Sequence, residues 1–98
     1  MKFIQIIEFQ TSRIDEIDAL EEEWRKATEG KRTSIRDYKV RDRDGKNTYM
    51  IIVEFPSYEE AMKNNELPET QRIAEGMTKL ADGPAIFRNL DVIDEHSG

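Results

Sequence analysis

The chain has 98 residues, the size of one domain, and its 21 acidic and 15 basic residues give a formal net charge of −6 at pH 7. An acidic chain argues against nucleic acid as the main partner, because phosphate binding needs a basic face. The sequence has no cysteine, which excludes disulfides, thiolate catalysis and cysteine-ligated metals and fits a reducing, cytoplasmic setting. Residues 1–9 contain a short apolar run that is interrupted by polar residues, unlike a signal peptide or a membrane span. We therefore expect neither secretion nor a membrane partner.

The first strand is expected over residues 2–9, where apolar side chains occupy both faces, as in a central strand. A helix is expected over residues 13–28, with Ser12 as its N-cap. The apolar residues of this helix recur every three or four positions, which predicts one buried stripe. The stripe consists of Ile14, Ile17, Leu20, Trp24 and Ala27.

A β-hairpin is expected in the middle of the chain, where strands over residues 33–42 and 48–55 flank the turn sequence Asp44-Gly45. A two-residue turn then sets the register between the two strands. The predicted pairs are Val40–Tyr49, Tyr38–Ile51, Arg36–Val53 and Ser34–Phe55. The first strand of this hairpin is the more polar one, which suits the edge of a sheet.

The second half of the chain continues with Ser57, a good N-cap that Glu60 completes as a capping box. The helix that follows is expected over residues 57–65. A proline then begins a second helical segment, over residues 68–81. The last strand is expected over residues 85–93.

These elements follow the order β-α-β-β-α-β. Right-handed crossovers and an antiparallel hairpin predict an α+β, ferredoxin-like fold, in which a four-stranded antiparallel sheet of order 4-1-3-2 carries the helices on one face. We expect residues 1–95 to form this single ferredoxin-like α+β barrel domain and residues 96–98 a polar tail. The uncovered sheet face is rich in apolar side chains, a liability in a monomer. We therefore predict a homodimer through the sheet faces, which together form a barrel.

The segment VEFPSYEEAMKN, residues 53–64, carries a resemblance to a known family. It resembles the end of the third strand and the following helix start of the dimeric α+β barrel proteins, of the antibiotic-biosynthesis-monooxygenase-like type. The likeness in element order covers residues 2–95. Proteins of that family usually hold a pocket between the helices and the sheet of each protomer. The resemblance implies a cofactor-independent, monooxygenase-like enzyme that acts on a small aromatic or polyketide-like molecule.

Two other roles follow from the same resemblance. The haem-degrading members use an Asn on the first strand, a Trp near the end of the third strand and a His on the following helical segment. The corresponding positions here fall near Ile7, at Phe55 and near Gln71 or Arg72. The only histidine, His96, lies in the tail, and an iron ligand must be held rigidly, so haem degradation is disfavoured and no cofactor is expected. The alternative to an enzyme is a non-catalytic ligand-binding or stress-type dimeric barrel.

Arg36 and Tyr38 are the candidate catalytic residues, because the predicted register places them on one face with Tyr49 and Phe55. An arginine beside aromatic rings can hold an anionic or enolic substrate and stabilise developing negative charge. The alternative for Arg36 is an edge-strand side chain that reaches water or pairs with a carboxylate. The candidate substrate-binding residues are Gln5, Trp24, Tyr49, Phe55 and Gln71, with no metal ligands among them. For Trp24 and Tyr49 the alternative is a place in the core.

Overall fold

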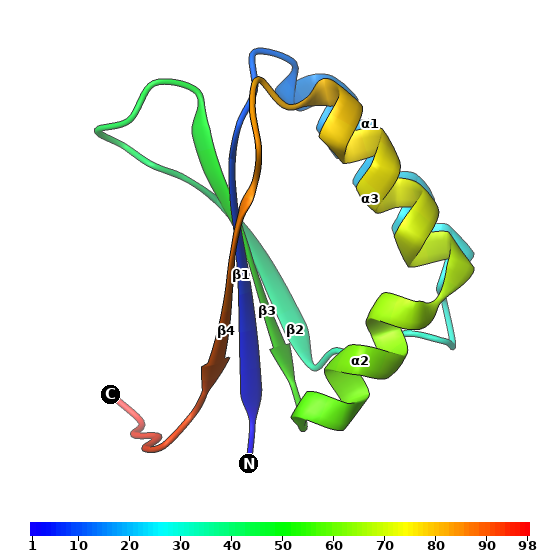
Figure 1. The fold of residues 1–98 in the computed structure, drawn as a ribbon. Helices are drawn as coiled ribbons and strands as arrows, with labels where there is room; N and C mark the ends of the chain where they lie inside the picture. The colour runs from blue at the N-terminus through cyan, green and yellow to red at the C-terminus, as the bar shows by residue number, and fades with distance from the viewer.

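The computed structural model describes residues 1–98 and contains four strands and three helices (Figure 1). The strands are β1 (Phe3–Gln10), β2 (Arg36–Arg41), β3 (Thr48–Phe55) and β4 (Ile86–Asp91). The helices are α1 (Ile14–Ala27), α2 (Tyr58–Glu66) and α3 (Pro68–Leu80). Neighbouring strands are antiparallel, in the order β2-β3-β1-β4. This is the predicted order 4-1-3-2 counted from the other edge, so the ferredoxin-like fold is confirmed.

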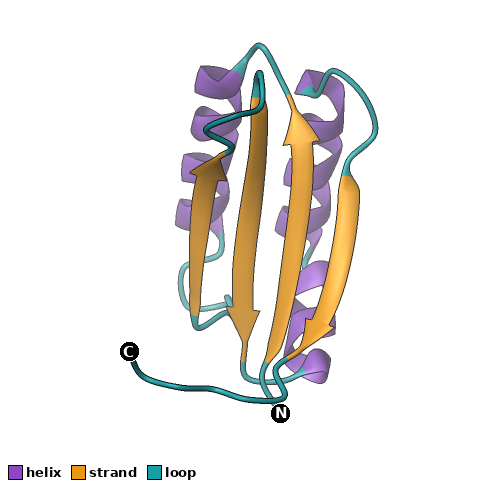
Figure 2. Ribbon diagram, turned by 90° about the vertical axis from the view of Figure 1, so that its left-hand side faces the viewer, coloured by secondary structure: helices purple, strands orange, loops and turns teal.

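All three helices lie on one face of the sheet, and the other face has no covering element (Figure 2). We call the first the helix face and the second the open face. None of the helices is both long enough and apolar enough to cross a membrane.

The hairpin register differs from the prediction by one residue. Tyr38 lies opposite Ile52 and Arg36 opposite Glu54, whereas the sequence predicted Ile51 and Val53 as their partners. Because side chains alternate along a strand, the shift moves Arg36 and Tyr38 to the open face, away from Tyr49 and Phe55. The predicted shared face of these four residues is therefore wrong.

The loop between β2 and β3 explains the shift. The Asp42 N–H donates to the carbonyl of Thr48 at 2.9 Å, which closes a loop longer than the predicted two-residue turn. Within it, the Asp42 carboxylate accepts the N–H of Asp44 at 2.9 Å. Asn47 adopts a left-handed conformation with φ of 53°, which asparagine tolerates better than most residues. Five residues, 43–47, therefore lie between Asp42 and Thr48, whereas the predicted turn has two. The odd difference reverses the facing of β2.

The predicted helix caps are confirmed in one case and wrong in the other. The Ser57 hydroxyl accepts the N–H of Glu60 at 3.2 Å and caps α2, although the Glu60 carboxylate pairs with Lys63 instead of closing a capping box. Ser12 does not cap α1. The N-cap residue is Arg13, and no side chain caps the helix. The hydroxyl of Thr11 instead accepts the N–H of Arg13 at 2.9 Å and donates to the carbonyl of Leu80 at 2.8 Å. This buried threonine therefore joins the start of α1 to the end of α3.

The core lies between the helices and the helix face. Phe3 and Phe55 from adjacent strands pack against Ala61 of α2, and all three are almost completely buried. Ile17 of α1 has no exposed surface. Gly76 of α3 allows α1 to come close, because a Cβ there would lie 2.9 Å from a methyl carbon of Leu20. The helix layer is therefore tight between α1 and α3 and beneath α2.

The buried position of Ile17 generates a test of this core. We expect Ile17→Ala to lower the free energy of unfolding by about 2–5 kcal/mol, because it removes apolar contacts and leaves a cavity. The matched control is Ile93→Ala, whose parent side chain is 82% exposed, so its effect stays within about 0.5 kcal/mol. Urea denaturation measures both. Equal losses in the two variants would contradict the assigned core.

Candidate functional site

A cavity of about 120 Å³ lies between the helix layer and the sheet. Its lining is mainly apolar. The sheet contributes Ile7, Ile51, Val53 and Phe55, and the helices contribute Trp24, Ile73, Ala74 and Met77. These residues reach the same space because alternate strand positions share the helix face and helical residues three or four apart share a side. The cavity is thus a consequence of how an amphipathic layer covers the sheet.

A buried amide oxygen in the cavity wall has no hydrogen-bond partner. Asn64 of α2 is only 5% exposed, and its Oδ1 atom makes no hydrogen bond. The residue follows Ala61 by one helical turn, so packing of Ala61 on the core directs Asn64 inward too. Leaving a buried acceptor unpaired costs about 1–3 kcal/mol. A donor supplied by a ligand in the cavity would remove that cost.

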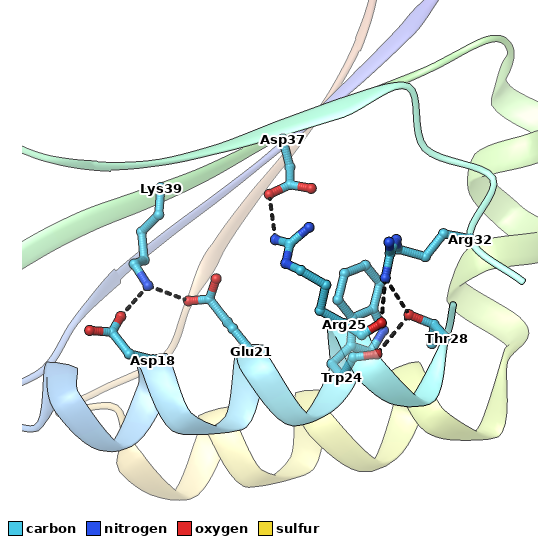
Figure 3. A network of polar contacts seen from close by, with 8 residues as sticks. All are labelled: Asp18, Glu21, Trp24, Arg25, Thr28, Arg32, Asp37 and Lys39. Atoms are coloured by element: carbon cyan, nitrogen blue, oxygen red, sulfur yellow. Dashed lines mark hydrogen bonds and ion pairs between the residues drawn. The ribbon is translucent and has the colours of Figure 1, made fainter. Parts of the chain in front are cut away.

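The indole of Trp24 is held by Arg25 and Arg32 (Figure 3) and by Thr70. Its Nε1–H donates to the hydroxyl of Thr70 at 2.9 Å, which joins α1 to α3. The guanidinium groups of Arg25 and Arg32 lie 6.0 and 5.5 Å from the ring centroid, within cation–π range. Arg32 also donates to the carbonyl of Arg25 at 2.6 Å. Trp24 is therefore a preorganised aromatic wall of the cavity.

Ion pairs join α1 to β2 at one side of the cavity (Figure 3). Arg25 donates to the Asp37 carboxylate at 3.0 Å, and Lys39 pairs with Asp18 and, at 3.0 Å, with Glu21. Of these residues, Glu21, Arg25 and Asp37 also line the cavity. This edge of the helix layer is therefore linked to the sheet by charged side chains.

The two basic residues of this edge have raised pKa values. A hydrogen bond to Asp37 raises the pKa of Arg25 above its ordinary value. Burial alone would lower the pKa of Lys39, but its hydrogen bonds to Asp18 and Glu21 outweigh burial and leave that pKa raised. A raised lysine pKa means that folding favours the charged form, so the stabilisation is complete below the unfolded pKa of about 10.4 and is lost as the pH rises through the folded value.

Three of the predicted substrate-binding residues line the cavity: Gln5, Trp24 and Phe55. The side-chain N–H of Gln5 donates to the side-chain oxygen of Asn89 in β4 at 3.4 Å. The side-chain oxygen of Gln5 makes no hydrogen bond to the protein. The other two lie elsewhere. Tyr49 stacks on Phe9, with ring centroids 5.9 Å apart, and Gln71 is on the exposed side of α3.

The candidate catalytic pair lies on the open face, on the opposite side of the sheet from the cavity. Arg36 Nε is 3.4 Å from the Glu54 carboxylate, and a side-chain hydrogen bond with Tyr38 followed by the charge of Glu54 raises the pKa of Arg36. Tyr38 is 54% exposed. The structure thus brings Arg36 and Tyr38 together, as predicted, but away from the residues proposed to bind substrate.

Sequence reasoning missed the polar residues of the cavity: Glu21, Asp37, Asn64 and Thr70. A signal existed for Asn64, since its spacing from Ala61 places both on one side of a short helix. Asp37 required the correct hairpin register, because only that register turns it toward α1. No three His, Cys, Asp or Glu side chains gather closely enough to hold a metal ion.

Solved structures with very different sequences share this fold. Rv0793 from Mycobacterium tuberculosis is 15% identical with a TM-score of 0.81, over 99% of this chain and 100% of that one. SnoaB from Streptomyces nogalater, described as a cofactor-independent oxygenase, is 13% identical with a TM-score of 0.80, over 96% and 95%. A candidate antibiotic biosynthesis monooxygenase from Caulobacter crescentus is 8% identical with a TM-score of 0.82, over 95% and 91%.

No protein-family model and no curated protein matches the sequence. At these identities the likeness to solved structures shows the fold. The predicted resemblance to antibiotic-biosynthesis-monooxygenase-like proteins is confirmed at that level.

The ion pairs between α1 and β2 generate a test by substitution of Lys39. We expect Lys39→Met to lower the free energy of unfolding by up to about 1 kcal/mol, because its ion pairs are partly exposed. The difference from the wild type should shrink at high salt, and also as the pH rises through the raised pKa of Lys39, where the wild-type lysine loses its charge. Lys26→Met is the control, since Lys26 is 77% exposed and 3.7 Å from Glu22. If the Lys39 variant loses the same free energy of unfolding at low and high salt, an electrostatic link between α1 and β2 is contradicted.

Proposed function

We propose that the protein binds a small, single-ring aromatic molecule with a hydrogen-bond donor in the cavity between helices and sheet. The observation that carries the proposal is the unpartnered oxygen of Asn64 in a cavity whose wall is mainly apolar and includes the rings of Trp24 and Phe55. A phenolic hydroxyl matches both features, because its ring suits the apolar wall and its O–H satisfies the amide oxygen. The cytoplasmic location expected from the sequence stays a prediction.

The size of the cavity limits the ligand. Its 120 Å³ is close to the roughly 150 Å³ of an engineered apolar cavity that binds benzene. It is well below the roughly 300–1,000 Å³ of pockets that hold drug-sized molecules. The proposal therefore favours one aromatic ring over the larger polyketide-like substrate that the resemblance allows.

Cofactor-independent oxygenation of the bound ring is the second candidate function. Two observations favour it: the Glu21 and Asp37 carboxylates line the cavity, and SnoaB shares the fold. In this candidate a carboxylate accepts the proton of the phenolic ligand, and a ring carbon of the resulting anion forms a bond to O2, which is the oxidant. The ring hydroperoxide then loses water, so one oxygen atom stays on the ring as a quinone carbonyl and the other leaves in the water. Both carboxylates are engaged by basic side chains, so ligand binding is the better-supported function.

We further propose that two copies pair through their open faces. Apolar residues follow one another across this face in the observed register. They include Ile4, Ile6, Tyr38, Val40, Met50, Ile52, Ile86 and Leu90. Several are substantially exposed, Tyr38 by 54% and Ile86 by 49%, and a monomer rarely exposes a contiguous apolar patch of this kind. The proposal assigns Arg36 and Tyr38 to this interface instead of to catalysis.

Asn64→Leu tests the ligand proposal. Removing one net hydrogen bond of about 0.5–1.5 kcal/mol should weaken phenol binding about twofold to tenfold. Toluene, which has the ring but no hydroxyl, should bind the variant and the wild type alike. The only tryptophan, Trp24, lies in the cavity wall, so its fluorescence reports both titrations. Failure of phenol to bind the wild type, or an equal loss for phenol and toluene, would contradict the proposal.

Native mass spectrometry with an open-face variant tests the proposed pairing. We expect the wild type to be a dimer and Ile52→Lys to be a monomer with unchanged circular dichroism, because a lysine at the centre of an apolar interface leaves a buried charge. Ile93→Lys, at an exposed position two residues after β4, is the control and should stay dimeric. A wild-type monomer would exclude the interface.

A further inference from the structure

A second cavity lies beside the first. It measures about 100 Å³ and is bounded by α3, the end of β1 and the start of β4. Seven of its nine lining residues are hydrophobic, Phe9, Ala85 and Phe87 among them. Phe87 is 60% exposed, so this cavity opens to solvent beside the edge strand. Nothing in the proposed function uses it.

The two cavities have three wall residues in common: Ile7, Ala74 and Met77. Along β1 the helix-face positions Gln5, Ile7 and Phe9 succeed one another, and the cavities divide at Ile7. Along α3 they divide at Ala74 and Met77, one helical turn apart. The cavities are therefore adjacent compartments between α3 and the sheet, with these three residues at their boundary.

The three shared residues differ in how well they can separate the compartments. Ala74 contributes a single methyl group. Ile7 belongs to the central strand, paired on both sides, and its β-branched side chain is stiff. Met77 has a long, unbranched side chain on the helix, which can fill an irregular gap. Met77 is thus the side chain whose removal joins the compartments with least change to the sheet.

We infer that Met77 is a specificity-determining residue, which limits the ligand to one aromatic ring by separating the two compartments. This inference rests on the proposed function, because it concerns the size of the ligand in the same site. Each compartment is close to the volume that one ring requires, and a fused two-ring molecule needs both. With Met77 in place, a second ring meets its side chain. Without it, the second ring enters the compartment lined by Phe9 and Phe87.

Phenol and 2-naphthol are the probes for this inference, because they share the hydroxyl and differ by one fused ring. The dissociation constants of both are measured by Trp24 fluorescence and calorimetry. Wild-type protein should bind phenol more tightly than 2-naphthol. Met77→Ala should bind 2-naphthol about tenfold more tightly than the wild type does, while phenol affinity changes less than about threefold.

Two further variants complete the design. Met77→Leu keeps a side chain of similar size and should keep the wild-type preference, which tests the same position if the alanine variant unfolds. Met62→Ala removes the same kind of side chain from the neighbouring core cluster, outside both cavities, and should leave the ratio of the two affinities unchanged. Thermal denaturation confirms that each variant is folded.

The outcomes separate the two proposals. If phenol binds the wild type but Met77→Ala leaves the ratio of 2-naphthol to phenol affinity unchanged, the role of Met77 is overturned and the proposed function stands. The same role is overturned if Met77→Leu or Met62→Ala shifts the ratio as far as Met77→Ala does. If the wild type binds neither molecule and Met77→Ala binds 2-naphthol, the separating role is supported and the proposed one-ring function fails. If no variant binds either molecule, both fail.

Discussion

The structure depends on one constraint: its two central strands carry apolar side chains on both faces, and the helices cover only one of them. In β1, Phe3 and Phe9 are buried under the helices, whereas Ile4 and Ile6 point to the open face. Burying apolar surface stabilises by about 25 cal/mol per Å², so an uncovered apolar face is a strong reason for association. The helix face therefore contributes to the core and the cavity, and the open face forms the proposed interface.

The cavity exists because the helix layer is anchored at its ends. At one end Ala61 packs on Phe3 and Phe55, and at the other the hydroxyl of Thr11 joins α1 to the end of α3. Between these anchors, charged side chains link α1 to β2. Ion pairs of exposed residues are weak and are screened by salt, so this edge can separate more readily than an apolar seam.

Much of the fold was predictable from local patterns. The bounds of β3 agree with the prediction, because a run of β-branched and aromatic residues ends at Pro56. The hairpin register was not predictable by the same means, since the side chain of Asp42 and the left-handed Asn47 decide the number of loop residues. The resulting shift of the register by one residue placed Arg36 and Tyr38 on the open face. These details of the loop conformation are not encoded by the Asp-Gly turn motif alone.

The candidate site was predictable only in its apolar part. Trp24 and Phe55 were identified from their places in a helical stripe and at a strand end, and both line the cavity. Asn64 was missed because an asparagine near the end of a short helix is usually solvated. Its burial results from the closeness of α2 to β3, which the order of elements does not specify.

The central claim is that a ligand occupies the cavity beneath the helices and contacts the amide of Asn64. Heteronuclear NMR of the labelled protein during a phenol titration tests it most directly. The account predicts that the side-chain amide of Asn64, the indole N–H of Trp24 and the backbone amides near Phe55 shift together with one dissociation constant. Saturable shifts confined to the open face, around Tyr38 and Ile52, or no saturable shifts at all, would contradict it.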